Sequence, residues 1–298
     1  MRKHPVILGI LILLVLGFFS YFFFYKAGLY SGGSRSFSLK DKIGVVSVEG
    51  VITDSIPITE QLDEFGNDNS VIAVILRVDS PGGGVAASQE IYDAVIELKK
   101  KKKVVASMGS IAASGGLLVA CSADKIVANP GTITGSISAI MQFANIEELL
   151  KKVGVKSSVV KSGQYKDIGS PLREMTSEEK VIVQDLVDDI YNQFIDVIVK
   201  ERRLPREKVV EIADGRVFSG RKAKELGLVD YLGDMTFAAK LASKMAGKTG
   251  EYELVYPEKK RFSAFDYVLE NAASKIGDSI KEKIKSTSSL SYLYYPGR

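Results

Sequence analysis

Three short segments of the chain carry residues that could do chemistry. The first spans residues 79–84 and reads Asp-Ser-Pro-Gly-Gly-Gly, directly after a run of β-branched residues. Consecutive glycines let main-chain N–H groups face a common point, an arrangement that can bind an anion or a developing oxyanion. The phosphate-binding pattern GxxxxGK[ST] is absent, because Gly84 is followed by Val-Ala-Ala. The segment is therefore a candidate oxyanion loop, with a purely structural turn as the alternative.

The second segment, residues 108–116, reads MGSIAASGG and contains two serines, Ser110 and Ser114. It lies where a strand-like run changes to a helix-like one. A serine that opens a helix exposes its hydroxyl near the positive end of the helix dipole, and small neighbours let a substrate approach closely. The strict GxSxG pattern is not present. Either serine is a candidate nucleophile, and either could instead be a helix N-cap.

The third segment, residues 162–171, reads SGQYKDIGSP and places a lysine, Lys166, among small and aromatic residues. A lysine acts as a general base only where burial lowers its pKa from about 10.4 toward 7 or 8. The sequence alone does not show whether a lysine is buried. A solvated surface position is therefore the alternative for Lys166, and equally for Lys125 and Lys161.

The rest of the inventory excludes several kinds of site. The 298 residues include one histidine, His4, and one cysteine, Cys121. An internal disulfide and zinc sites built from several Cys or His ligands are therefore excluded. No motif implies a metal or nucleotide cofactor, so none is expected. The formal net charge of +4 is too small to indicate nucleic-acid binding, and 46% hydrophobic with 26% charged residues is typical of a globular protein.

The N-terminal region has the composition of a membrane anchor. Residues 6–25 carry no charge, and 20 residues of helix are about 30 Å long, enough to cross the hydrocarbon core of a bilayer. Arg2 and Lys3 precede this segment, so the positive-inside tendency places residues 1–5 in the cytoplasm and the body of the protein outside. His4 would then lie across the membrane from the body, and any hydrolase there would need another base.

The remaining chain divides into a linker and an α/β body. Residues 26–40 include the small, polar stretch SGGSRSFS and are expected to be a linker, and the body is expected over residues 41–245. Runs of strand character alternate with helical patterns, which predicts an α/β fold with largely parallel pairing. The strand runs are 43–48, 71–78, 104–108 and 125–128, and the helical patterns between them are 86–100 and 112–121.

Two further helices are predicted from their end signals. Thr176 and Glu179 form a capping box ahead of a long amphipathic pattern that ends before Pro205 and whose apolar stripe is expected to face the core. Ser219 and Gly227 bracket a short helix as its N-cap and C-terminal stop.

A C-terminal extension, residues 246–298, carries another amphipathic pattern. From Pro257 onward eight Lys or Arg residues stand against five Asp or Glu residues. Two interpretations compete: a helix lying on a membrane surface, and a helix packed on the body or on a neighbouring subunit, of which packing is favoured. The apolar residues at helical spacing are Phe265, Leu269, Ile276, Ile280 and Ile284.

Taken together and in this order, the three segments resemble the signal peptide peptidase A family, membrane-anchored serine proteases with a Ser/Lys dyad whose fold is related to the Clp protease and the crotonases. The resemblance runs from about Ile43 to Gly233 and includes GRVFSGRKAKELGLVD at 215–230. It implies an α/β fold of repeated strand-strand-helix units preceded by one N-terminal transmembrane helix. Because the motif set occurs once, the chain is similar to the short, single-domain members.

The resemblance also implies a role for each matching residue. Ser114 in SIAASGG matches the nucleophile, and Lys166 in GQYKDIGSP matches its general base. Ser136 in TGSIS matches the serine that holds this lysine in position. Gly83 in SPGGG matches the oxyanion loop, and Gly115 is the natural second N–H donor.

The function implied by the resemblance is hydrolysis of remnant signal peptides and similar apolar, membrane-associated peptides through an acyl-enzyme. The family's members assemble as ring- or dome-shaped homo-oligomers, with no metal and no nucleic-acid partner. The expected location is the cell membrane, with a single span and an extracytoplasmic catalytic domain. Two alternatives stay open: a crotonase-like acyl-CoA enzyme, which would normally need a well-placed carboxylate, and a non-catalytic membrane scaffold.

Overall fold

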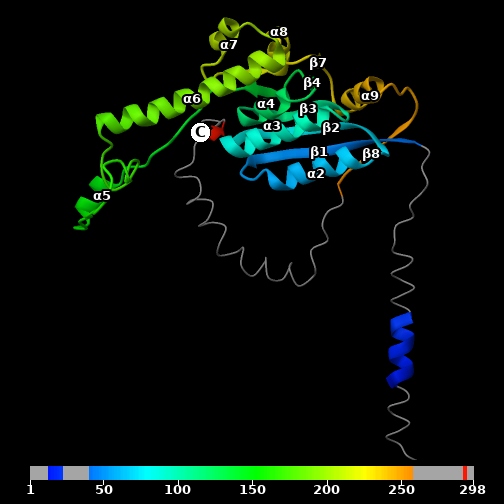
Figure 1. The fold of residues 1–298 in the computed structure, drawn as a ribbon, viewed down its shortest axis with the longest axis horizontal. Helices are drawn as coiled ribbons and strands as arrows, with labels where there is room; N and C mark the ends of the chain where they lie inside the picture. The colour runs from blue at the N-terminus through cyan, green and yellow to red at the C-terminus, as the bar shows by residue number, and fades with distance from the viewer. Residues whose placement is uncertain (1–12, 23–39, 258–290, 294–298) are drawn as a thin grey trace, which may run out of the picture. The chain divides into compact units, whose positions relative to one another are not determined.

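The computed structural model describes residues 13–22, 40–257 and 291–293, in two units, Met1–Lys40 and Asp41–Arg298 (Figure 1). In the first unit residues 13–22 are helical. Within the described ranges no helix combines the length and the apolar character that crossing a membrane requires. The rest of the predicted span, at 6–12 and 23–25, lies outside the described residues, as does the predicted amphipathic helix from Phe265 to Ile284.

The second unit alternates strands and helices. Its strands are β1 (Asp41–Ile52), β2 (Val71–Gly84), β3 (Lys103–Ala113), β4 (Lys125–Ala128), β5 (Ile133–Gly135), β6 (Val217–Ser219), β7 (Tyr231–Leu232), β8 (Tyr252–Val255) and β9 (Ser291–Leu293). Its helices are α2 (Ile56–Asn67), α3 (Val85–Lys99), α4 (Gly115–Cys121), α5 (Glu147–Lys152), α6 (Ser177–Arg202), α7 (Arg206–Ile212), α8 (Gly220–Glu225) and α9 (Met235–Met245).

The strands form one mixed sheet. Its order is β6-β5-β3-β2-β1-β8, with β4 joining β3 to β7 and β9 lying against β2. The central strands β1, β2 and β3 run parallel, whereas β5–β6 and β2–β9 are antiparallel pairs. The predicted α/β fold with largely parallel pairing is therefore confirmed. Two strands, β8 and β9, come from the segment that follows Met245.

The central strands are buried on both faces, as their continuous β-branched runs predict. Val45 and Ile75 pack on one face with Ala238 of α9. Val46 and Leu76 point to the opposite face, where α2, α3, α4 and α6 contribute to a larger core. Each of these strand side chains is almost fully buried, which stabilises the fold by roughly 1.5–3 kcal/mol per side chain. The sheet is thus a rigid platform for the loops at its edge.

The end of β3 differs from the sequence-based expectation. The helical pattern at 112–121 predicts a helix from Ala112, but β3 continues to Ala113 and the helix begins at Gly115. The reason is pairing on both sides, because Ala112 is aligned with Ser80 of β2 and with Thr134 of β5. The ladder outweighs the helix propensity of the small residues, and Ser114 becomes the junction between strand and helix.

The capping box at Thr176 and Glu179 is present as predicted, and α6 ends at Arg202. Only its C-terminal half packs in the core, where Phe194, Ile195 and Ile198 are fully buried. The expectation that the whole apolar stripe faces the core is wrong for the first half. There the helix leaves the body together with α5, and both extend away from the sheet (Figure 1). We refer to residues 140–186 as the arm.

Candidate active site

Ser114 lies at a sharp turn between β3 and α4. Its backbone has φ 54° and ψ −121°. Non-glycine residues rarely adopt this conformation, because it is strained and persists only where the surrounding structure enforces it. The Ser114 side chain makes no capping hydrogen bond, so the alternative role of an N-cap is not used. The Oγ atom is buried and has no hydrogen-bond partner among the described residues. A buried hydroxyl without a partner is unusual and makes Ser114 a candidate functional residue.

Glycines of β2 lie directly against the residue after Ser114. A Cβ atom on Gly115 would come within 3.3 Å of both the Gly83 nitrogen and the Gly82 Cα atom. A Cβ atom on Gly83 would lie 2.1 Å from the carbonyl oxygen of Ile52, so only glycine fits there. The main-chain nitrogen of Gly83 therefore lies close to Gly115, the residue that follows Ser114.

The glycine segment is a strand rather than a turn. Gly82 is aligned with Val51 of β1 and Gly83 with Ile52. Gly82 has φ 98°, and Ser80 fixes this conformation from a fully buried position. The Ser80 hydroxyl donates to the carbonyl oxygen of Gly50 at 2.6 Å and accepts from the Gly82 N–H at 3.1 Å. The interpretation of 79–84 as a simple structural turn is therefore wrong.

Ser136 lies beside Ser114. Ala113 and Gly135 are aligned as partners in β3 and β5, and each serine follows one of them. The N–H of Ser114 donates to the carbonyl oxygen of Gly135 at 2.9 Å, and that of Ser136 donates to the carbonyl oxygen of Arg216 at 2.8 Å. Ser136 has φ 51° and is 6% exposed. Two strained serines thus lie side by side at the same edge of the sheet.

Lys166 is placed differently, in the arm. Its side chain is exposed, and in the described part of the chain it forms neither an ion pair nor a hydrogen bond. The Oγ atom of Ser114 has no partner there either, so one chain does not bring the Lys166 ammonium within hydrogen-bonding distance of Ser114. The structure brings together Ser114, Ser136, Gly83 and Gly115, and it leaves Lys166 apart from them.

The other two candidate lysines are neutralised by acids. Lys161 pairs with Asp167 and donates to the carbonyl oxygen of Gln164 at 2.7 Å. Lys125 lies 3.5 Å from a carboxylate oxygen of Asp230. Both lysines therefore have structural partners, which leaves Lys166 as the candidate base whose charge is uncompensated within the described chain.

An ionic network that the sequence motifs do not reveal supports the Lys166 loop. The guanidinium of Arg173 donates to Asp167 at 2.9 Å and to Glu179 at 2.8 Å. Hydrogen bonding from Arg173, with help from the Thr176 N–H, lowers the pKa of Glu179 to about 2. Arg173 and Lys161 lower the pKa of Asp167 as well. The network connects the loop to the N-terminal end of α6 through Arg173, which contacts Asp167 and Glu179. These side chains come together only when the loop folds back on the helix.

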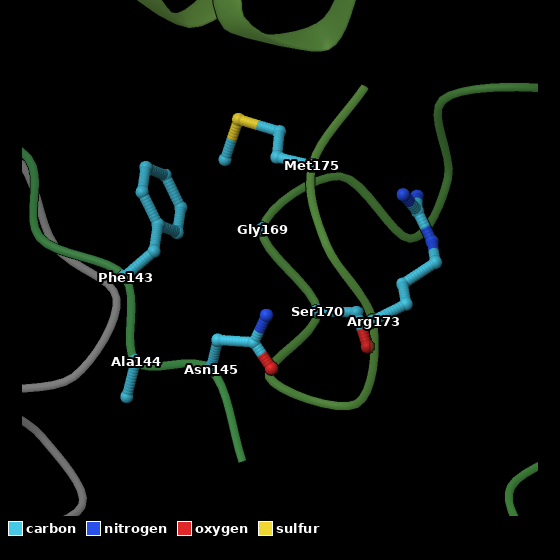
Figure 2. Close-up of a pocket in the computed structure, with 7 residues that line it drawn as sticks. All are labelled: Phe143, Ala144, Asn145, Gly169, Ser170, Arg173 and Met175. Atoms are coloured by element: carbon cyan, nitrogen blue, oxygen red, sulfur yellow. The ribbon is translucent and has the colours of Figure 1, made fainter. Parts of the chain in front are cut away.

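A small pocket of about 100 Å³ lies in the same arm. Figure 2 shows the Phe143 and Met175 side chains close to Gly169, whereas the Arg173 side chain is directed away from them. Gly169 has φ 76°, and a Cβ atom there would lie 2.3 Å from the Phe143 ring. The pocket contains none of the candidate catalytic residues, and Gly169 in its lining belongs to the loop that carries Lys166.

Cys121 is the chain's one thiol and lies in the core. It is fully buried at the end of α4, and burial raises its pKa to about 12. A thiol that stays protonated is a poor nucleophile. The nucleophile of the site is therefore not this cysteine.

Comparison with known proteins agrees with this geometry. Residues 96–249 match the model of peptidase family S49, and residues 38–134 match that of the Clp protease. The chain belongs to peptidase family S49. It is a serine protease, and the resemblance to the signal peptide peptidase A family is confirmed. The S49 match contains Ser114, Ser136 and Lys166, whereas Gly83 lies in the Clp match.

Several relatives are similar to this S49 peptidase over most of its body. A protein of Synechocystis sp., named as a protease, is 47% identical over 211 residues, which are 69% of this chain and 76% of that protein. A protease of Methanocaldococcus jannaschii is 42% identical over 62% of this chain, and a signal peptide peptidase of Enterococcus faecium 37% identical over 64%. The match spans 60% of each of the latter two relatives.

Proposed function

We propose that this S49 peptidase is a membrane-anchored endopeptidase in which Ser114 is the nucleophile and Lys166 the general base. The observation that carries the proposal is the Ser114 turn, where a buried hydroxyl without a hydrogen-bond partner lies beside closely packed glycines. A nucleophile needs an unengaged oxygen, and an acyl-transfer site needs N–H donors aimed at the developing oxyanion. Gly83 and Gly115 are the proposed donors.

The proposed dyad is completed by a second copy of the chain. Lys166 lies in an arm whose apolar side chains are exposed, among them Leu149 at 58% and Val181 at 60%. Exposed apolar surface of this kind is typical of an interface. A lysine that entered a neighbouring copy's site would be removed from solvent. Ser136, which lies beside Ser114, could then form a hydrogen bond with the side-chain nitrogen of this lysine. The homo-oligomer is therefore required for catalysis, with one site formed by each Ser114.

The reaction follows from these positions. Neutral Lys166 accepts the proton of the Ser114 hydroxyl while Oγ bonds to the substrate carbonyl carbon. The resulting oxyanion accepts hydrogen bonds from the main-chain N–H groups of Gly83 and Gly115. The C–N bond then breaks, and the proton moves from Lys166 to the leaving amine. Water next gives a proton to Lys166 while its oxygen attacks the acyl carbon. The bond between that carbon and the Ser114 Oγ atom then breaks, and Oγ takes the proton back from Lys166, which releases the new carboxyl end and restores the Ser114 hydroxyl and the neutral lysine.

The proposed substrates are remnant signal peptides and other apolar peptides held at a membrane. One relative is named a signal peptide peptidase, and the uncharged segment 6–25 would hold enzyme and substrate in one plane. We assign residues 1–5 to the cytoplasm, 6–25 to the anchor and 26–40 to a linker. The protease domain at 41–245 and the extension at 246–298 then lie outside the cytoplasm.

A fluorophosphonate probe tests this function, because it forms an adduct only with an activated serine. The full-length protein in detergent is expected to label at Ser114, and Ser114→Ala and Lys166→Ala are each expected to abolish labelling. Ser110→Ala and Lys125→Ala are the matched controls, since they remove a neighbouring serine and another candidate lysine outside the arm, and labelling is expected to survive both. Labelling that persists in Ser114→Ala would refute the nucleophile assignment. A crotonase-like enzyme or a scaffold would give no adduct that depends on Lys166.

A further inference from the structure

Strand β3 contains extra residues relative to β2 just before it reaches the candidate site. Val78 of β2 is aligned with Met108, and the next aligned pair is Ser80 with Ala112. A single residue of β2, Asp79, is therefore opposed by three residues of β3. Such an insertion is a β-bulge, a feature that is over-represented next to active sites, where it changes the direction of a strand.

The bulge determines which part of β2 lies beside Ser114. Without the two extra residues, regular parallel pairing would place Ser114 opposite Gly84. The observed register moves Ser114 back by two positions, to the level of Gly82, which is roughly 6–7 Å along the strand at a rise of about 3.3 Å per residue. The close approach of Gly115 to the Gly83 nitrogen depends on this offset.

Side chains from two neighbouring segments hold the bulge in place. Main-chain groups inside a bulge lose their regular partners and need others when they are buried. A carboxylate oxygen of Asp79 accepts a hydrogen bond from the Ile111 N–H at 3.0 Å. Gly109 leaves room for this carboxylate, because a Cβ atom there would lie 2.6 Å from the Asp79 Cγ atom. The buried Thr132 hydroxyl donates to the carbonyl oxygen of Gly109 at 2.7 Å.

We propose that Asp79 is a positioning residue of this protease, which holds the bulge and thereby sets the separation between the Ser114 Oγ atom and the Gly83 N–H. This inference rests on the proposed function, since it concerns the nucleophile and an oxyanion donor of that site. Asp79 acts through the main chain, because its carboxylate is bound to the Ile111 N–H. A misplacement of about 1 Å at a reacting group can reduce a rate by about 100-fold.

Three substitutions at Asp79 separate the position of the oxygen from its charge. Asp79→Asn keeps an oxygen that can accept from the Ile111 N–H, and its kcat for a peptide substrate is expected to stay within about twofold of the wild type. Asp79→Ala removes the acceptor and is expected to lower kcat by about 100-fold with KM little changed. Asp79→Glu keeps the charge but displaces the carboxylate by one methylene, and about a tenfold loss of kcat is expected.

The order of these rates decides the proposal. A kcat close to the wild-type value in both Asp79→Ala and Asp79→Glu would overturn it. A loss in Asp79→Asn larger than that in Asp79→Glu would also overturn it, because the charge would then matter more than the position. If Asp79→Ala does not fold, the comparison of the Asn and Glu variants gives the answer alone.

Asp124→Ala is the matched control for a merely structural role. A carboxylate oxygen of Asp124 accepts from the Val104 N–H at 2.9 Å, so the control removes a similar hydrogen bond from the opposite end of β3. Circular dichroism is expected to show a lower Tm for both Ala variants, whereas only Asp79→Ala is expected to have a lower kcat per folded molecule. Equal kcat losses in the two variants would refute the positioning role.

Fluorophosphonate labelling of the same full-length proteins in detergent distinguishes the two proposals. Absence of an adduct at Ser114 in the wild type would refute the proposed function. An adduct that forms in the wild type and equally fast in Asp79→Ala and Asp79→Glu would leave the nucleophile assigned and refute the role of Asp79.

Discussion

The N–H of Ser114 donates a 2.9 Å hydrogen bond to the carbonyl oxygen of Gly135, the residue that precedes Ser136. This bond continues the β3–β5 ladder by one step and holds the two serines at a fixed separation. Both serines have a positive φ, so the local strain is concentrated where the ladder ends. The main chain, rather than side-chain contacts, therefore positions the proposed nucleophile and the residue proposed to hold its base.

Gly115→Ala is predicted to reduce kcat by about 100- to 1000-fold, the usual effect of losing one oxyanion donor. The added Cβ atom would lie 2.6 Å from the Ser88 hydroxyl and 3.3 Å from the Gly83 nitrogen, which forces the two proposed N–H donors apart. The hydroxyl can move, so the fold is expected to survive, as circular dichroism would report.

Gly131→Ala is the control for this substitution, because its Cβ atom would meet nothing within 4 Å. Peptide turnover by the control is expected to equal that of the wild type. Unchanged kcat in Gly115→Ala would remove this residue from the oxyanion site.

Arg173→Met is predicted to destabilise the arm in a pH-dependent way. Arg173 holds the pKa of Glu179 near 2 and also lowers that of Asp167, whereas an unfolded Glu has a pKa of about 4.3. A lowered pKa in the folded state stabilises the fold above the unfolded value, and this contribution is lost as pH falls toward 2. The wild type should therefore have the higher Tm at pH 7, and the difference should shrink between pH 5 and pH 3.

Thermal unfolding followed by circular dichroism across this pH range measures the effect. Arg221→Met is a suitable comparison, because Arg221 is exposed outside the arm and forms no ion pair in the described part of the chain. A difference in Tm between wild type and Arg173→Met that stays constant from pH 7 to pH 3 would contradict the assigned linkage.

The double substitution Val181→Lys/Leu186→Lys is predicted to dissociate the oligomer and to abolish proteolysis. Both side chains are largely exposed in the single chain, and burying two lysines in an interface without partners is costly. Val210→Lys is the control, since Val210 is a similarly exposed apolar residue on α7, outside the arm. Sedimentation in detergent should show a smaller particle for the double variant alone, and an unchanged mass would place the interface elsewhere.

Much of the body could be predicted from local sequence. The β-branched runs that became β1, β2 and β4 predict strands because such residues fit a sheet buried on both faces. The capping box at Thr176 and the cap at Ser219 were predictable because each depends on residues within one helical turn. Ser114 could be singled out because small neighbours and a strand-to-helix change meet there.

Features that depend on distant pairing could not be predicted. The extension of β3 to Ala113 is set by its partners in β2 and β5. The network around Arg173 forms only when the loop folds back on α6. The placement of β9 beside Gly83 joins residues more than two hundred positions apart. The separation of Lys166 from Ser114 within one chain is likewise invisible to a motif, which specifies residue types and not which copy supplies them.

Subunit complementation tests the shared dyad most directly. Ser114→Ala chains and Lys166→Ala chains, each inactive alone, are mixed in equal amounts, dissociated and allowed to reassemble. If each site takes its serine from one chain and its lysine from a neighbour, random mixing in a symmetric assembly restores about a quarter of the wild-type peptidase rate. If both residues act within one chain, no mixed assembly contains an intact dyad. A mixture that stays inactive after verified reassembly, or a single variant that is active alone, would contradict the proposed mechanism.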